Sequence, residues 1–216
     1  MPMPVVIAAF LLAPSEPLPG APREQPPAVS AIAFGFAFEP QVGSLAALDD
    51  QLRAYGFAPV GSVFLPTWGL RGRMRLRSGL YVGMSMSYGL RNNRDAISPV
   101  PTTTTFVDTA IGAGYWAPFG LLAGLDVGFA SVVHSVGSEQ EGGALVYLGP
   151  SLHPRVGWAY VGQGPSVVIT AGYLVHIPVG SPHSQPLWEA SFERPAIHSF
   201  TVGLESGFGW RPGRRR

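Results

Sequence analysis

Apolar residues alternate with small or polar residues along most of the chain after residue 30. The segment 80–90 (LYVGMSMSYGL) shows this pattern best. Side chains of a β-strand point alternately to its two faces, so a period of two separates the residues by face. One face carries Leu80, Val82, Met84, Met86, Tyr88 and Leu90, and the other carries Tyr81, Gly83, Ser85, Ser87 and Gly89. The pattern predicts a strand with one apolar face.

The segment 64–77 repeats the alternation with charges on one face. Its apolar face carries Phe64, Trp68, Leu70, Met74 and Leu76, and its other face carries Arg71, Arg73, Arg75 and Arg77. An arginine that faced hydrocarbon at the middle of a bilayer would cost about 2–4 kcal/mol. The four arginines must therefore face water or a polar interior.

Eight segments share this two-faced pattern, at residues 32–39, 64–77, 80–90, 107–115, 121–134, 147–160, 167–177 and 200–210. The glycines lie mostly on the polar face, and Gly72 is the exception. A soluble lipocalin-type barrel would be apolar inside and charged outside, which is the reverse. The sequence therefore predicts an all-β fold, an eight-stranded antiparallel up-and-down transmembrane β-barrel. The interior of such a barrel is only wide enough for side chains.

The connections between these strands alternate in length. Residues 78–79, 118–120 and 161–165 form short links, and residues 40–63, 91–101, 135–143 and 179–197 form long ones. This alternation is typical of outer-membrane barrels, which have short periplasmic turns and long external loops. Both termini are then expected on the periplasmic side. A helix is expected over 44–55 in the first long link, with Ser44 as its N-cap, because leucines recur there at helical spacing.

Composition agrees with a membrane barrel. Charged residues make up 12% of the chain, about half the ~25% of an average soluble domain, and the mean hydropathy is +0.22. No uninterrupted run of about 18 apolar residues occurs, which excludes a transmembrane helix, and lipid otherwise tolerates only closed barrels. The net charge of +1 gives no excess of basic residues that would indicate binding to nucleic acid. The absence of cysteine excludes disulfides and thiolate metal sites.

The N-terminal residues indicate export. Val5 to Ala13 (VVIAAFLLA) form an apolar run too short to span a bilayer, and they fit the core of a secretory signal. We expect a signal peptide at 1–21, a proline-rich linker at 22–29, the barrel domain at 30–212 and an arginine-rich tail at 213–216.

At this point the chain resembles the small outer-membrane barrels of Gram-negative bacteria, of the outer membrane protein A-like and X-like type. The stretches that carry the resemblance are GLYVGMSMSYGL (79–90), LLAGLDVGF (121–129) and FTVGLESGFGW (200–210). The resemblance implies residence in the outer-membrane lipid bilayer and recognition of the last strand by the barrel-assembly machinery. The chain departs from the pattern of this family in two ways. Six residues follow Trp210, where the family usually ends. Pro150 and Pro154 lie within a predicted strand, and we expect a bulge or break there.

The polar face collects a candidate charge cluster in the lumen. Its members are Arg71, Arg73, Arg75, Arg77, Arg155, Asp108, Asp126 and Glu205, with Glu39 near the outer end. Buried charges must be paired, so we expect a salt-bridge network that fills the lumen and has more cations than carboxylates. A gated ion path is the alternative.

Three histidines, His134, His153 and His176, also fall on the lumen face. They come from different strands at different heights, which favours hydrogen-bonded side chains over a metal site. We expect no cofactor.

These observations predict a non-enzymatic outer-membrane protein that presents outward-facing loops to an unidentified extracellular ligand. A narrow pore or small-solute conduit is the first alternative. A lipid-A-modifying enzyme is the second. That enzyme would need a serine, a histidine and an acid together on the lipid-facing surface, but Ser131 and His198 are three strands apart and no acid accompanies them.

Overall fold

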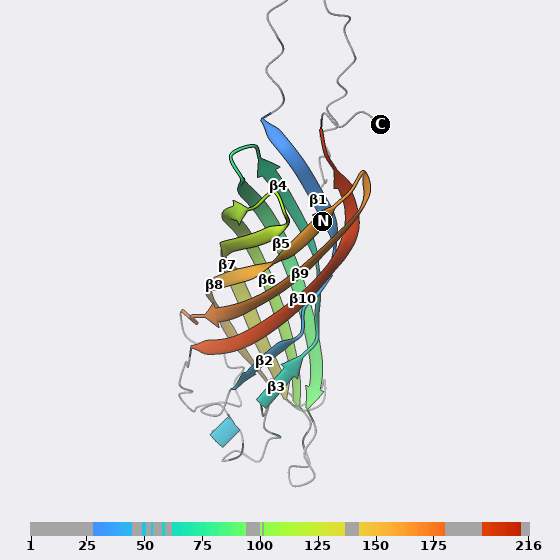
Figure 1. Ribbon diagram of the computed structural model, residues 1–216. Coiled ribbons are helices and arrows are strands. Elements are labelled where there is room, and N and C mark those ends of the chain that lie inside the picture. Colours follow the sequence, from blue (N-terminus) through green and yellow to red (C-terminus); the bar gives the residue numbers. More distant parts are fainter. Residues whose placement is uncertain are drawn as a thin grey trace, which may run out of the picture.

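Eight antiparallel strands form the wall of a barrel (Figure 1). The computed structural model describes residues 28–44, 49–50, 53, 58, 62–93, 100, 102–136, 143–179 and 196–212. The wall consists of β1 (Val29–Phe38), β4 (Thr67–Leu76), β5 (Leu80–Asn93), β6 (Thr102–Trp116), β7 (Leu121–Val136), β8 (Gly143–Val161), β9 (Gly164–His176) and β10 (Ile197–Trp210). In the described part of the chain, no helix has the length and apolar character needed to cross a membrane.

The wall closes because the first strand pairs with the last. Each wall strand is hydrogen-bonded to the next one along the chain, and β1 pairs with β10 from Ile32↔Trp210 to Phe38↔Leu204. A closed wall leaves no strand edge with unpaired backbone groups, which lipid does not tolerate. The predicted all-β, eight-stranded antiparallel barrel is confirmed.

Two short strands extend the wall beyond prolines. β2 (Gln41–Ser44) follows β1 after Pro40, and β3 (Ser62–Leu65) precedes β4 before Pro66. β2 pairs with the start of β10 and with β3, so the expected loop over 40–63 is shorter than predicted at both ends. Proline lacks the N–H donor of a ladder, so the pairing breaks at the proline and resumes after it.

The helix expected over 44–55 is not established in the described residues. Ser44 is the last residue of β2, and the residues that directly follow it lie outside the described residues. Of the remaining positions only Asp49, Asp50 and Arg53 are described. These three residues are helical, and the rest of the expected helix lies outside the described residues.

β8 runs without a break past both of its prolines. Pro150 and Pro154 point outward. β8 pairs with β9 from Ser151 to Val161, and within this span the pairing is missing at His153 and Pro154. The pairs Leu152↔Val175 and Arg155↔Gly172 keep one register, so no bulge is present, and the break predicted at Pro154 is limited to the ladder bonds of two residues. The missing proline donor removes ladder bonds locally without an inserted residue.

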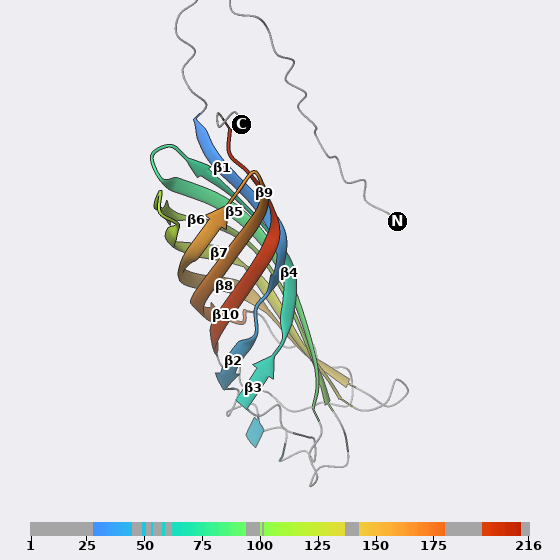
Figure 2. The same ribbon diagram turned by 45° about the vertical axis from the view of Figure 1, so that its right-hand side comes forward.

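Short turns join β4 to β5, β6 to β7 and β8 to β9, all at one end of the barrel. Gly79 and Gly120 have φ values of 91° and 108° in the first two turns. Residues with a Cβ rarely adopt this conformation, which accounts for glycine there. The start of β1 and the end of β10 lie at the same end, and β2 and β3 lie at the other (Figures 1 and 2). We call the end with the three short turns, where β1 starts and β10 ends, the short-turn end.

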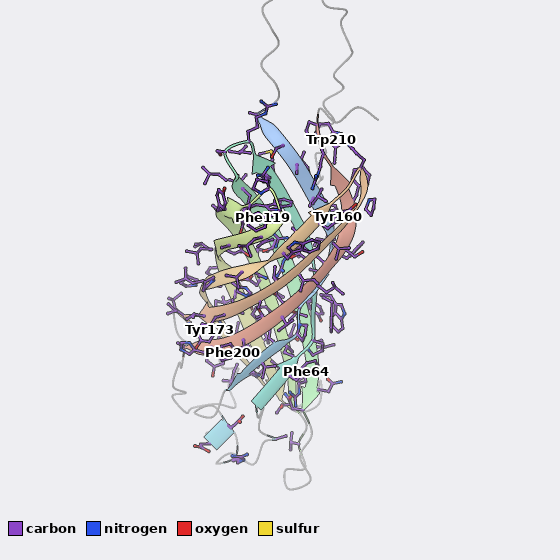
Figure 3. The ribbon with its side chains drawn as sticks, viewed as in Figure 1. Phe64, Phe119, Tyr160, Tyr173, Phe200 and Trp210 are labelled. Atoms are coloured by element: carbon purple, nitrogen blue, oxygen red, sulfur yellow. The ribbon has the colours of Figure 1, made fainter. Side chains whose placement is uncertain are left out.

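The outer surface of the wall is apolar and the inner surface carries the polar groups. Phe36, Met84 and Ile111 are more than 70% exposed, whereas Glu205 is buried. Aromatic side chains lie toward both ends: Phe119, Tyr160 and Trp210 toward the short-turn end, and Phe64, Tyr173 and Phe200 toward the opposite end (Figure 3). Apolar walls flanked by aromatic girdles are typical of membrane barrels.

Cysteine substitution along β5 tests this two-faced wall. In lipid vesicles, Met84→Cys should be shielded from aqueous maleimide and should place an attached environment-sensitive dye in an apolar setting, because Met84 points outward. Ser87→Cys should place the same dye in a polar setting, because Ser87 faces the lumen. Equal dye emission at the two positions would contradict the assignment of faces.

Candidate functional site in the barrel lumen

Buried arginines and carboxylates meet in the centre of the lumen. Glu205 on β10 accepts hydrogen bonds from two arginines of β4: Arg71 Nη1 donates to Oε1 at 2.9 Å and Arg73 Nη2 donates to the same oxygen at 2.8 Å. Arg73 Nη1 also donates to Oε2. Charge-assisted bonds of this bidentate kind are among the strongest in proteins.

Glu39 connects this group to the opposite wall. It accepts hydrogen bonds from Arg71 on β4 and from Arg155 on β8. Arg155 Nε also lies 2.7 Å from Asp126 Oδ2 on β7. The order of contacts is Arg73, Glu205, Arg71, Glu39, Arg155 and Asp126, and none of the six residues is more than 9% exposed. We call these six residues the lumen network, and it has equal numbers of cations and anions.

Glycines give the lumen network its space. Paired residues on neighbouring strands share a face, and four members have glycine as a cross-strand partner. The pairs are Arg71↔Gly35, Arg73↔Gly83, Asp126↔Gly112 and Arg155↔Gly172. A Cβ at Gly112 would collide with the Asp126 carboxylate, and one at Gly172 would lie 2.6 Å from His153 Nε2. The narrow interior of an eight-stranded barrel accepts arginines only where neighbouring positions lack side chains.

Three residues expected in the charge cluster lie apart from the lumen network. Arg75 reaches the short-turn end, where its Nε donates to the Trp116 carbonyl at 2.6 Å and its Nη1 donates to Ser30 Oγ at 2.7 Å. Arg77 is exposed in the turn after β4. Asp108 accepts a hydrogen bond from Ser151 Oγ at 2.5 Å instead of an ion pair. The expected excess of cations is therefore absent from the network.

Glu39 was expected near the outer end of its strand, but it lies in the middle of the network. Phe38 pairs with Leu204, which is in the middle of β10, so the end of β1 is level with the centre of the last strand. The Glu39 backbone is fixed by Thr67, because Glu39 N donates to the Thr67 carbonyl at 2.8 Å and Thr67 Oγ1 donates to the Glu39 carbonyl. Alternation along 32–39 places Glu39 on the lumen face but does not give its height.

The three lumen histidines have different surroundings. His153 Nδ1 lies 2.6 Å from Arg155 Nη2, and its Nε2 lies 2.9 Å from Thr201 Oγ1. Because arginine only donates, Nδ1 accepts and the ring proton is on Nε2. His134 Nδ1 lies 3.0 Å from Thr104 Oγ1. His176 is buried, and neither of its ring nitrogens has a hydrogen-bond partner among the described residues.

An apolar cluster closes the lumen between the network and the short-turn end. Its large members are Tyr81, Trp116, Leu122, Val161 and Val168, all at most 3% exposed. With the lumen network, this cluster fills the interior with side chains from opposite walls. Among the residues that the structure describes, no group of three or more His, Asp or Glu side chains is arranged to hold a metal ion.

Comparison with solved structures gives the same architecture. The crystal structure of Ail, the attachment invasion locus protein of Yersinia pestis, matches with a TM-score of 0.55 at 10% identity, covering 85% of this chain and 99% of that chain. Ail in complex with the heparin analogue sucrose octasulfate matches with a TM-score of 0.53 at 11% identity, covering 84% and 98%. Neisserial surface protein A matches with a TM-score of 0.47 at 12% identity, covering 82% and 96%. No protein-family model and no curated protein matches the chain.

At this level of identity the similarity to Ail shows the fold alone. It agrees with the closed wall, the apolar outer surface and the aromatic residues toward both ends. The predicted resemblance to small outer-membrane barrels is confirmed, and this chain has the fold of a transmembrane barrel of the bacterial outer-membrane type.

The order of contacts in the lumen network predicts which carboxylate matters most for stability. Among the described residues, Glu205→Gln removes the only anionic partner of Arg73, whereas Asp126→Asn leaves Arg155 paired with Glu39. Breaking a buried pair typically costs about 3–5 kcal/mol, and we expect Glu205→Gln to approach this loss and Asp126→Asn to lose clearly less. Urea unfolding in detergent micelles measures both, with Arg77→Gln as an exposed control. Equal losses for the two carboxylates would show that the contact order does not determine stability.

Proposed function

We propose that this protein is a closed, non-enzymatic scaffold in the bacterial outer membrane that holds its long loops outside the cell. The observation that carries the proposal is the lumen network, in which Arg71 and Arg155 on opposite walls share Glu39. Ion pairs across the lumen hold opposite strands at a fixed distance. The barrel is therefore a rigid scaffold for the loops.

The filled lumen supports a scaffold over a pore or solute conduit. A permeant ion would have to pass the six residues of the network and then the cluster around Trp116 and Leu122. Barrels of eight strands have no room for a water-filled channel once side chains fill the interior.

The outer surface gives little support to a lipid-A-modifying enzyme. Tyr173 OH lies 3.2 Å from His198 Nδ1 on the lipid-facing side of β9 and β10. Ser131 is on β7, and β8 and β9 separate it from His198. No carboxylate of the described residues contacts either side chain. A nucleophile, its base and an orienting acid would have to be within hydrogen-bond reach of one another.

The sequence of the outer connections indicates what the loops bind. Residues 45–61, 94–101, 137–142 and 180–196 contain seven Asp or Glu and three Arg. The Ail structure named above was solved with a heparin analogue, which is a polyanion. Acidic loops repel polyanions, so we propose that the extracellular partner of this chain is neutral or cationic at its contact surface.

Planar-bilayer recordings test the closed lumen. We expect no discrete conductance steps from the purified protein, because the network and the apolar cluster fill the interior. A double variant, Arg71→Ser with Arg155→Ser, removes two long side chains from the network and should raise conductance if it still inserts, which faster migration of unboiled protein on detergent gels would show. Reproducible steps from the unaltered protein would make the pore the better assignment.

Binding to intact cells tests the charge of the loops. Cells that display the protein should retain no more fluorescent heparin at physiological salt than cells without it, because only the outer loops are accessible. Saturable retention that is displaced by sucrose octasulfate would contradict the proposal of a neutral or cationic partner.

A further inference from the structure

A hollow of about 230 Å³ lies at the short-turn end, away from the lumen network. The residues of its lining that bear on its chemistry are Arg75, Arg211, Phe119, Trp158 and Tyr160. Trp116 also lines it and separates it from the lumen, because Trp116 belongs to the apolar cluster that closes the barrel. The hollow therefore opens at the end that faces the periplasm in outer-membrane barrels.

Arginines are the only charged side chains of the described residues at this end. They are Arg75, Arg77 and Arg211, and none forms an ion pair with another described residue. In the lumen network, by contrast, every arginine contacts at least one carboxylate. The short-turn end therefore has a positive potential that no carboxylate within the described chain offsets.

The structure fixes Arg75 at the hollow. Its hydrogen bonds to the Trp116 carbonyl and to Ser30 Oγ hold the guanidinium in place and leave its other N–H groups available. Arg211 offers a second guanidinium, and its backbone carbonyl accepts a hydrogen bond from Gln163 Nε2 at 2.6 Å. Two guanidinium groups at one hollow match the oxygens of a phosphate better than those of a neutral ligand.

Aromatic side chains form the apolar part of the hollow. Trp158 and Tyr160 stack with ring centroids 6.4 Å apart, and Trp158 Nε1 donates to the Phe119 carbonyl at 3.2 Å. Trp158 and Tyr160 are about half exposed on the lipid-facing side of β8. Such rings lie where lipid headgroups meet hydrocarbon. The arginine side of the hollow can therefore bind a negatively charged group, and the adjoining aromatic side can contact the first carbons of acyl chains.

We propose that this hollow binds the headgroup of an anionic phospholipid from the periplasmic leaflet. The phosphate is held by Arg75 and Arg211, and the glycerol and first acyl carbons lie against Trp158 and Tyr160. A volume of about 230 Å³ accommodates a glycerophosphate group but not whole acyl chains, which then lie on the outer wall. Anionic lipids are favoured over zwitterionic ones, because a headgroup ammonium finds no carboxylate among the described residues at this end.

Native mass spectrometry of the full chain in an uncharged detergent tests the site. The probes are dioctanoyl phosphatidylglycerol, dioctanoyl phosphatidylcholine and sn-glycerol 3-phosphate. We expect one phosphatidylglycerol to bind at least tenfold more tightly than either of the other probes. Arg211→Gln should weaken it about tenfold, since hydrogen bonds to charged groups are worth that much.

Matched variants separate this site from general charge attraction. Arg77→Gln removes the same charge from the same end but outside the hollow, and it should change phosphatidylglycerol affinity less than twofold. Arg75→Gln should weaken binding like Arg211→Gln. Because Arg75 also bonds the chain, the Arg211 variant, whose guanidinium forms no ion pair with a described residue, keeps the test valid if the Arg75 variant fails to fold.

Several results would overturn the proposal. Equal affinity for phosphatidylglycerol and phosphatidylcholine would remove the charge selectivity, and equal loss with Arg77→Gln would show diffuse attraction. Glycerol 3-phosphate that binds as tightly as the lipid would make this a site for soluble phosphates. The absence of any bound lipid would remove the site altogether.

Discussion

The pairing of β1 with β10 is the constraint on which the rest of the structure depends. Lipid supplies no hydrogen bonds, so a wall of strands is stable there only if its first and last edges meet. Closure with eight strands then fixes the radius of the interior. Every polar side chain on the inner face has to fit that radius and find its partners within it, because little water enters to replace them.

This radius explains why arginine and glycine occur together. Arg71, Arg73 and Arg155 are long enough to reach the opposite side of the lumen, and each has glycine beside it on a neighbouring strand. The same restriction explains the apolar cluster around Trp116, where large side chains fill the space without charges. The interior is thus charged at its centre and apolar toward the short-turn end, and a scaffold needs no passage between them.

Alternation predicted which face each side chain occupies, because facing depends only on the strand period. It could not predict height, because height depends on the stagger between strands distant in sequence. Glu39 therefore joined the network against expectation, and Arg75 and Arg77, on the same face as Arg71, extended past it to the short-turn end. The effect of the prolines on strand length was also not predicted from the sequence. Pro40 and Pro66 interrupt strands that resume beyond them, and Pro154 only removes ladder bonds. The hollow with Arg211 combines residues from turns and strand ends, for which periodicity carries no information.

The lumen network also has a consequence for how the chain folds. Its contacts join residues far apart in sequence: Arg71 and Glu205 are 134 positions apart, and Arg155 and Glu39 are 116 apart. The two bonds of Glu205 and the Arg155–Glu39 pair form only when the last strand has reached the first. The pairs Arg71–Glu39 and Arg155–Asp126 join neighbouring strands and do not need closure, so an unclosed intermediate leaves Arg73 and Glu205 without their partners. Such non-local contacts slow folding, and an unpaired Arg73 and Glu205 raise the free energy of the unclosed barrel. Closure of the seam between β1 and β10 is therefore coupled to the pairing of Glu205 with the two arginines of β4.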